Sequence, residues 1–164
     1  MNQTDDARQP EPMNLRQRIE SAMREAMLAR DIRRTGTLRM AMAAFQNRRI
    51  ELGRDLTDED VVDVLTKQVK QRRESIELYR KGSRPELADA EEAELAILRE
   101  FLPEPLTDAE LERLVRDAVA AADATGPADM GRVMGVLVPQ TKGRADGKAV
   151  SELVRRLLSG GSAE

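Results

Sequence analysis

Apolar residues recur along most of this chain at the three- and four-residue spacing of an amphipathic α-helix. No segment alternates apolar and polar residues as a half-buried strand would. Before residue 103 the spacing predicts four helices, over about 15–30, 33–52, 57–81 and 84–101. We expect Gly53 and Gly82 to end the second and third of these helices, and Ser83 to cap the fourth.

Pro103 and Pro105 interrupt the helical pattern, because two prolines in three residues forbid helix continuation. Beyond them the spacing predicts three more helices, over about 107–124, 128–140 and 147–158. Thr57 and Thr107 each stand three positions before an acidic residue, which is the spacing of a capping box at a helix start. Each of the two threonines is therefore predicted to begin a helix.

These elements predict an all-α protein of two parts. The N-terminal four-helix domain covers 13–103, and a C-terminal three-helix bundle covers 104–164. Residues 1–12 have almost no apolar side chain and are predicted to form a disordered tail. The pattern leaves open whether Met1 or Met13 is the native start.

Composition removes several classes of function. The chain has no cysteine and no histidine, which excludes a disulfide framework, a thiolate metal site and the commonest general base. No loop has EF-hand spacing, so neither a metal nor a cofactor is predicted. One tyrosine and two phenylalanines are too few for base-stacking platforms. Because no apolar run approaches about 18 residues and no signal peptide is recognisable, we expect a soluble, cytoplasmic protein without a membrane partner.

The densest group of charged and glycine residues is the segment 142–148 (KGRADGK), named here the basic turn. Three of its residues are expected to build the helix connection: Gly143, Asp146 and Gly147. Three cations remain as candidates for phosphate contact: Lys142, Arg144 and Lys148. They would surround a positive helix N-terminus, a geometry that attracts phosphate.

The formal net charge of −3 hides alternating charge blocks. Residues 55–63 carry a net −5, residues 67–84 a net +5, and residues 85–101 a net −5. One interpretation is that neighbouring helices neutralise each other. The other is a basic ridge that continues to the basic turn and consists of Lys67, Lys70, Arg72, Arg73, Arg80, Lys81 and Arg84. Lys70, Arg73 and, from a later helix, Arg132 are therefore secondary candidates for RNA contact.

Several segments resemble the YqeY-like family and occur in the family's order. They are 70–77 (KQRRESIE), 79–84 (YRKGSR), 91–95 (EEAEL), 101–103 (FLP), 129–135 (DMGRVMG) and 143–148 (GRADGK). The resemblance covers roughly residues 13–158. Its last part is also similar to the tail domain of the B subunit of the tRNA-dependent amidotransferase (GatB). The resemblance thus implies a helical N-terminal domain joined to a GatB-tail-like bundle.

In the amidotransferase that tail helps to hold tRNA, so the resemblance implies an accessory protein that binds tRNA or another structured RNA. The family is also associated with carbon–nitrogen ligase activity that uses glutamine as the amide donor. This chain has no counterpart of the catalytic body, and nothing in the sequence places a nucleophile beside a base. We therefore name no catalytic residue and favour a protein that is not an enzyme.

A protein-interaction adaptor is the alternative to RNA binding. Such an adaptor would dock through its amphipathic helices on a translation or amidotransferase component. The two hypotheses predict opposite results: RNA binding is lost when charge is reversed at the basic turn, whereas adaptor binding resists nuclease and that reversal. DNA binding is not predicted, because the net charge gives no bulk attraction to nucleic acid.

Overall fold

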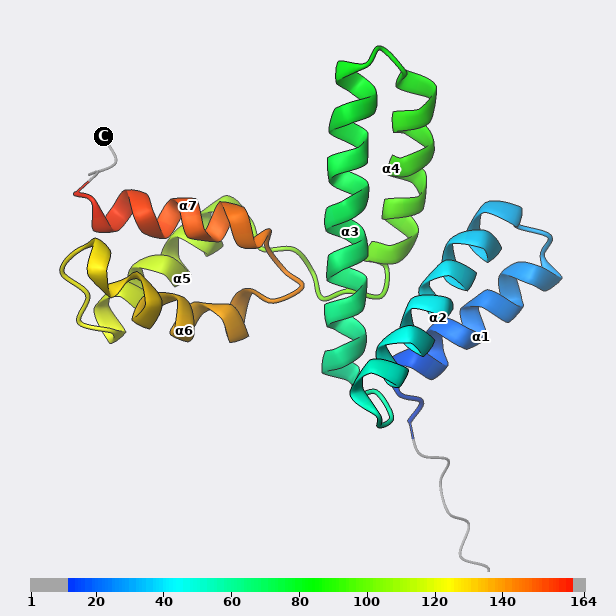
Figure 1. Ribbon diagram of the computed structural model, residues 1–164, viewed down its shortest axis with the longest axis horizontal. Helices are drawn as coiled ribbons and strands as arrows, with labels where there is room; N and C mark the ends of the chain where they lie inside the picture. Colours follow the sequence, from blue (N-terminus) through cyan, green and yellow to red (C-terminus); the bar gives the residue numbers. More distant parts are fainter. Residues whose placement is uncertain (1–11, 161–164) are drawn as a thin grey trace, which may run out of the picture.

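The computed structural model describes residues 12–160, and every regular element in that range is helical (Figure 1). The α-helices are α1 (Leu15–Leu28), α2 (Ile32–Leu52), α3 (Asp58–Lys81), α4 (Pro85–Arg99), α5 (Asp108–Ala121), α6 (Met130–Thr141) and α7 (Gly147–Leu158). A single 3-10 turn, η1 (Pro127–Asp129), leads into α6. The predicted all-α fold is confirmed. The predicted tail lies outside the described residues up to residue 11.

The N-terminal unit, residues 12–102, consists of two helical hairpins packed together, α1 with α2 and α3 with α4 (Figure 1). Each helix contributes large apolar side chains to one cluster, because the apolar positions of each lie on one helical face. The most deeply buried large side chains are Ile19, Leu38, Phe45, Leu65 and Leu98. The cluster therefore draws on all four helices of this unit.

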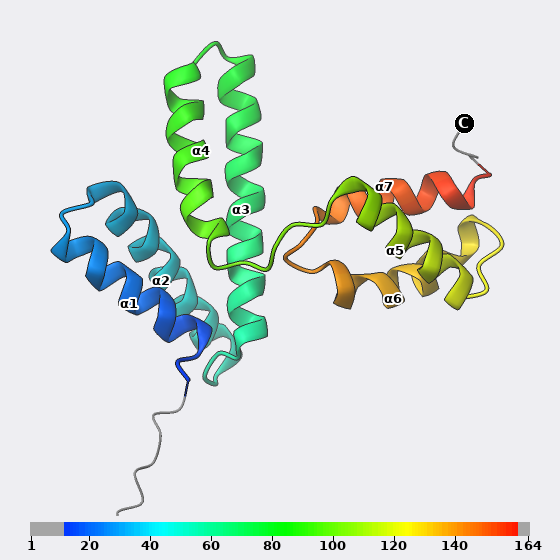
Figure 2. The same cartoon turned by 180° about the vertical axis from the view of Figure 1, so that it is seen from behind.

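The C-terminal unit, residues 106–160, has its own hydrophobic cluster among α5, α6 and α7. Its fully buried members include Val115, Val133, Leu137 and Val154. Figures 1 and 2 show this unit beside the first half of α3, whereas the far half of the α3–α4 hairpin projects past it. The two units thus meet at an angle, with the segment around Pro103 passing between them.

Two helix starts form as the local spacing predicts. The Thr57 hydroxyl accepts from the Asp60 N–H at 3.2 Å, and the Asp60 carboxylate accepts from the Thr57 N–H at 2.8 Å. Thr107 and Glu110 make the same reciprocal pair at the start of α5. These bonds satisfy backbone donors that a helix start leaves without intrahelical partners, so both predicted capping boxes are confirmed.

The turn between α3 and α4 differs from the prediction. Ser83 does not cap α4; the N-cap is Arg84, and its side chain makes no capping bond. The reason is the way α3 ends: the Arg84 N–H donates to the Tyr79 carbonyl at 2.8 Å, and Ser83 adopts a left-handed φ of 55°. Ser83 therefore closes the preceding helix instead of opening the next one.

Candidate nucleic-acid interface

The backbone of the basic turn is closely fitted against the N-terminal unit. Gly143 has a φ of 72°, in the left-handed region that favours glycine. A β-carbon there would lie 2.9 Å from Val62 Cγ1, 3.5 Å from Pro103 Cδ and 3.6 Å from Thr66 Oγ1. Glycine is therefore required at this position for two reasons: its backbone conformation is left-handed, and α3 leaves no room for a side chain.

Lys142 is held by two carboxylates of α3. Its Nζ lies 2.8 Å from Asp63 Oδ1 and 3.1 Å from Glu59 Oε1. Hydrogen bonds first to Asp63 and then to Glu59 raise the pKa of Lys142 above the usual lysine value. The structure thus gives this predicted phosphate contact an intrachain role, because a phosphate would have to displace two carboxylates.

Arg144 fastens the turn to the segment that links the two units. Its Nε donates to the Glu104 carbonyl at 3.0 Å, and its own carbonyl accepts from the Leu106 N–H at 2.8 Å. These bonds supply partners to backbone groups on either side of Pro105, where no helix can do so. Arg144 is half-buried, and its remaining guanidinium nitrogens are not used in these contacts.

The end of the basic turn is more open. Asp146 caps α7, because its Oδ1 accepts from the Lys148 N–H at 3.0 Å. Gly147 is the first residue of α7, and a β-carbon there would meet nothing within 4 Å. The Lys148 side chain is exposed, and no carboxylate of the described residues pairs with it.

Arg132 lies at the opposite end of α6 and binds within its own turn. Its Nη2 pairs with the Asp129 carboxylate. The pKa of Asp129 falls to about 2, because the carboxylate accepts from the Thr125 N–H and, next in importance, from Arg132. Arg132 is therefore not brought together with the cations of the basic turn.

Lys70 and Arg73 lie on the face of α3 that begins beside the basic turn. Thr66, beside Gly143, lies one helical turn before Lys70 and two turns before Arg73 on a shared face of α3, a rise of about 6 and 10 Å. Among the described residues neither Lys70 nor Arg73 has an ion pair. Arg99 lines the same hollow as Arg73 and adds a third cation beside it. Burial first, and then the charge of Arg73, lower the pKa of Arg99.

Part of the predicted basic ridge is neutralised by α4. Arg72 lies 2.7 Å from Glu91 and 2.5 Å from Glu94, and Arg80 pairs with Glu92. Arg84, in addition, lies 2.6 Å from Glu86 in the first turn of α4. The ridge is therefore divided: Lys70 and Arg73 lack such partners in the described chain, whereas these three arginines have them.

Residues 12–160 lack two features that would point to other kinds of site. No group of three or more carboxylates is placed to hold a metal ion in that part of the chain. None of its helices is both long enough and apolar enough to cross a membrane.

The partners of Lys142, Glu59 and Asp63, are not evident from the sequence. Glu59 is 83 residues away along the chain, and no local pattern reports such a contact. The available signal was the net charge of −5 over 55–63, which is complementary to the basic turn. That signal names a region with which the turn could pair, but not a residue.

A family model described as Yqey-like protein matches residues 16–158, which is most of the chain. The chain belongs to the YqeY-like family. The resemblance predicted from the segments at 70–84 and 143–148 is thereby confirmed. The more specific likeness to the GatB tail stays a prediction.

Proteins of three organisms are similar to much of this chain. "Altered inheritance of mitochondria protein 41, mitochondrial" of Pyrenophora tritici-repentis is 28% identical over 144 residues, 86% of this chain and 79% of that protein. The protein of the same name from Lachancea thermotolerans is 29% identical over 112 residues, 66% of this chain and 60% of that protein. An uncharacterized protein of Schizosaccharomyces pombe is 34% identical over 91 residues, 56% of this chain and 74% of that protein. The match therefore spans less than two thirds of the Lachancea protein.

The expected cytoplasmic location is wrong in the light of these relatives, because two of them are named as mitochondrial. That expectation rested on the lack of a long apolar segment. Mitochondrial targeting segments are amphipathic and rich in arginine and serine, so the apolar criterion does not detect them.

Proposed function

We propose that this YqeY-like protein binds structured RNA, with tRNA as the expected class. The binding surface, named here the RNA surface, consists of Lys70, Arg73, Arg144 and Lys148. One observation carries the proposal: Gly143 packs against Val62 and Thr66, so the basic turn lies next to the α3 face that continues to Lys70 and Arg73.

The chemistry of the RNA surface suits phosphate groups and not bases. The three aromatic residues of the chain include Phe45, which is fully buried in the core. Recognition would rest on the spacing of cations against the RNA backbone, the usual mode for double-stranded regions of RNA. Lys142 is not included in the RNA surface, because its two ion pairs hold it against α3. It would position the turn, while Arg144 and Lys148 would contact the RNA phosphates. The predicted likeness to a tRNA-holding tail domain adds support.

The test is binding of bulk tRNA as a function of salt. Four phosphate contacts predict a log–log slope of roughly −3, because about 0.7–0.9 counterions are released per contact. Lys70→Glu combined with Lys148→Glu should remove about half of that slope and weaken binding at low salt. These two residues are chosen because both are exposed and have no ion pair among the described residues, so reversal disturbs no observed contact.

The matched control is Arg113→Glu combined with Arg116→Glu. Both arginines are exposed on α5, and the change in net charge is the same. The control should keep the slope. Equal loss in both double variants would mean that only net charge matters, and absence of tRNA binding at low salt would refute the proposal outright.

A protein-interaction adaptor is the second candidate, and a different observation favours it. Helix α2 keeps Ile32 and Met40 largely exposed, at 88% and 61%. Large apolar side chains that gather on a surface mark interaction sites more often than chance. The adaptor predicts a protein partner whose capture survives nuclease and the Lys70→Glu/Lys148→Glu change.

A further inference from the structure

Helix α2 has an exposed apolar stripe on the side away from its buried face. The stripe consists of Ile32, Gly36, Met40 and Ala43, all exposed and spaced by four, four and three residues. That spacing keeps them on one face of the helix. The buried residues Leu38, Ala41 and Phe45 lie on the opposite side and account for the packing of α2 in the core. Packing within the described chain therefore does not account for this stripe.

Gly36 is the least expected residue of this stripe. Glycine in the interior of a helix destabilises that helix relative to alanine. A β-carbon at Gly36 would meet nothing within 4 Å, so no contact in the described chain requires glycine there. Gly36 would, however, let the backbone of another helix approach α2 closely between Ile32 and Met40.

Two hollows lie along α2, the first beside this stripe and the second further along the helix. The first, about 590 Å³, is lined by Ile32, Gly36 and Met40 and by Glu94 of α4. The second, about 450 Å³, lies further along α2, between Ala44–Glu51 and the α3 residues Asp63–Gln71. We name the two together the α2 groove. Glu94, which lines the first hollow, also pairs with Arg72 of α3.

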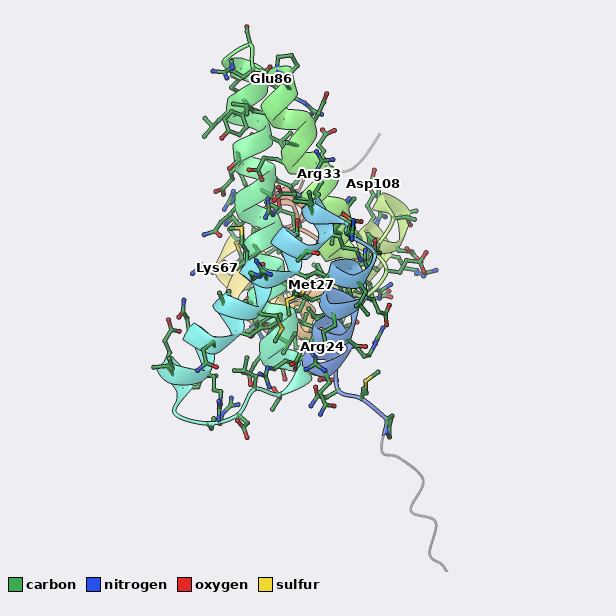
Figure 3. All side chains as sticks on the ribbon, turned by 90° about the vertical axis from the view of Figure 1, so that its right-hand side faces the viewer. Arg24, Met27, Arg33, Lys67, Glu86 and Asp108 are labelled. Atoms are coloured by element: carbon green, nitrogen blue, oxygen red, sulfur yellow. The ribbon has the colours of Figure 1, made fainter. Side chains whose placement is uncertain are left out.

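The charges in the α2 groove select the kind of occupant. Its acidic residues are already engaged within the chain: Glu94 pairs with Arg72, Asp63 with Lys142, and Glu51 with Arg48. Two lining cations have no ion pair among the described residues, Arg33 at the start of α2 and Lys67 on α3; Figure 3 labels both. An occupant with carboxylates at two separated positions would complement the groove.

We propose that the α2 groove binds an amphipathic α-helix of a partner protein. The apolar side of that helix packs on Ile32, Gly36 and Met40, and its acidic residues pair with Arg33 and Lys67. A helix fits because the stripe and both hollows lie along one 21-residue helix, α2, which presents anchors at helical spacing. The α2 groove and the RNA surface involve different residues, so either can be tested without the other.

The probe is a synthetic amphipathic peptide of about 18 residues, long enough to fold on the groove. One version carries glutamates beside its apolar face and the other carries lysines at the same positions. Fluorescence anisotropy of the labelled peptides with the whole protein should show binding of the glutamate version alone. Replacing Arg33 and Lys67 by Glu should reverse this preference.

Gly36→Leu separates loss of binding from loss of folding. Leucine fills the approach to α2 and should weaken glutamate-peptide binding by about tenfold or more. The same change raises helix propensity, and the β-carbon that it adds meets no atom within 4 Å, so the melting temperature should not fall. Gly135→Leu is the matched control, because Gly135 is an equally open helical glycine on α6; it should leave binding unchanged.

Three results would overturn the proposal. The first is equal binding of the glutamate and lysine peptides, or of neither. The second is a Gly36→Leu variant that binds as well as the unmodified protein. The third is a dimer of the free protein, seen by sedimentation and dispersed by Gly36→Leu, which would make a second copy of this chain the occupant.

Discussion

Gly143 and Gly36 lie in two regions that the structure treats in opposite ways. Gly143, in the basic turn, has a φ of 72° and leaves only 2.9 Å between a virtual β-carbon and Val62 Cγ1. Gly36, in the α2 groove, is helical and has nothing within 4 Å of such a carbon. One glycine is explained by the chain's own packing, whereas the other is not.

The same contrast holds for the charges of the two regions. In the basic turn Lys142 and Arg144 bind groups of the N-terminal unit and of the link. In the α2 groove the carboxylates are engaged and Arg33 and Lys67 are left without an ion pair in the described chain. The basic turn, which stands out in the sequence, thus serves partly as an internal contact. The exposed face of α2, which does not stand out, has no internal contact of this kind.

The largest expected effect comes from Gly143→Ala. Alanine would be forced into the left-handed region, at a cost of about 1–2 kcal/mol, and its β-carbon would press on Val62. With the steric contact included, we expect a loss of about 2–4 kcal/mol in the contact between the units. Hydrogen exchange at the Leu106 amide, which donates to the Arg144 carbonyl, should accelerate accordingly.

Gly147→Ala is the control for that experiment, because Gly147 begins α7 in open surroundings. It should leave exchange at Leu106 unchanged. A Gly143→Ala protein with unchanged Leu106 exchange would show that the basic turn is not seated on α3, and the contrast between the two regions would disappear.

Contacts between residues close together in the sequence could be predicted, whereas contacts between distant residues could not. Thr57 and Asp60 are three residues apart, and their capping box was predicted because both groups are visible in one window. Ser83 was misassigned as a cap because the left-handed end of α3 depends on a bond from Arg84 back to Tyr79. The all-α class needed only periodicity, which is a local property.

The candidate site was predictable only in its residue types. The cations of the basic turn stood out by composition, but Lys142 pairs with Asp63 and Glu59, and that contact exists only after the units have packed. The α2 groove was not predicted at all. Ile32 and Met40 fit an amphipathic helix whether they face the core or solvent, and only packing decides between the two.

Gly36→Ala should have the opposite sign from Gly143→Ala. Alanine raises the helix propensity of α2 and meets no neighbouring atom, so the free energy of unfolding should rise by about 0.5–1 kcal/mol. Urea unfolding followed by circular dichroism measures this change. A loss of stability would reveal an internal contact of Gly36 and would remove the argument that its glycine serves a partner.

The smallest effect is expected from Lys142→Met, compared with Lys148→Met as the same change at a lysine without an ion pair in the described chain. Because Lys142 and its carboxylates are partly exposed, the difference in unfolding free energy should be about 0.5 kcal/mol and should shrink in high salt. The pKa of Lys142 is raised in the folded protein, so its contribution is fully present below the ordinary lysine value of about 10.4. It is lost as the pH rises through the folded value, and urea unfolding between neutral and strongly alkaline pH should show the two variants converging there. Equal stability of the two variants at neutral pH and low salt would mean that the carboxylates of α3 do not hold the turn, leaving Lys142 available to RNA like its neighbours.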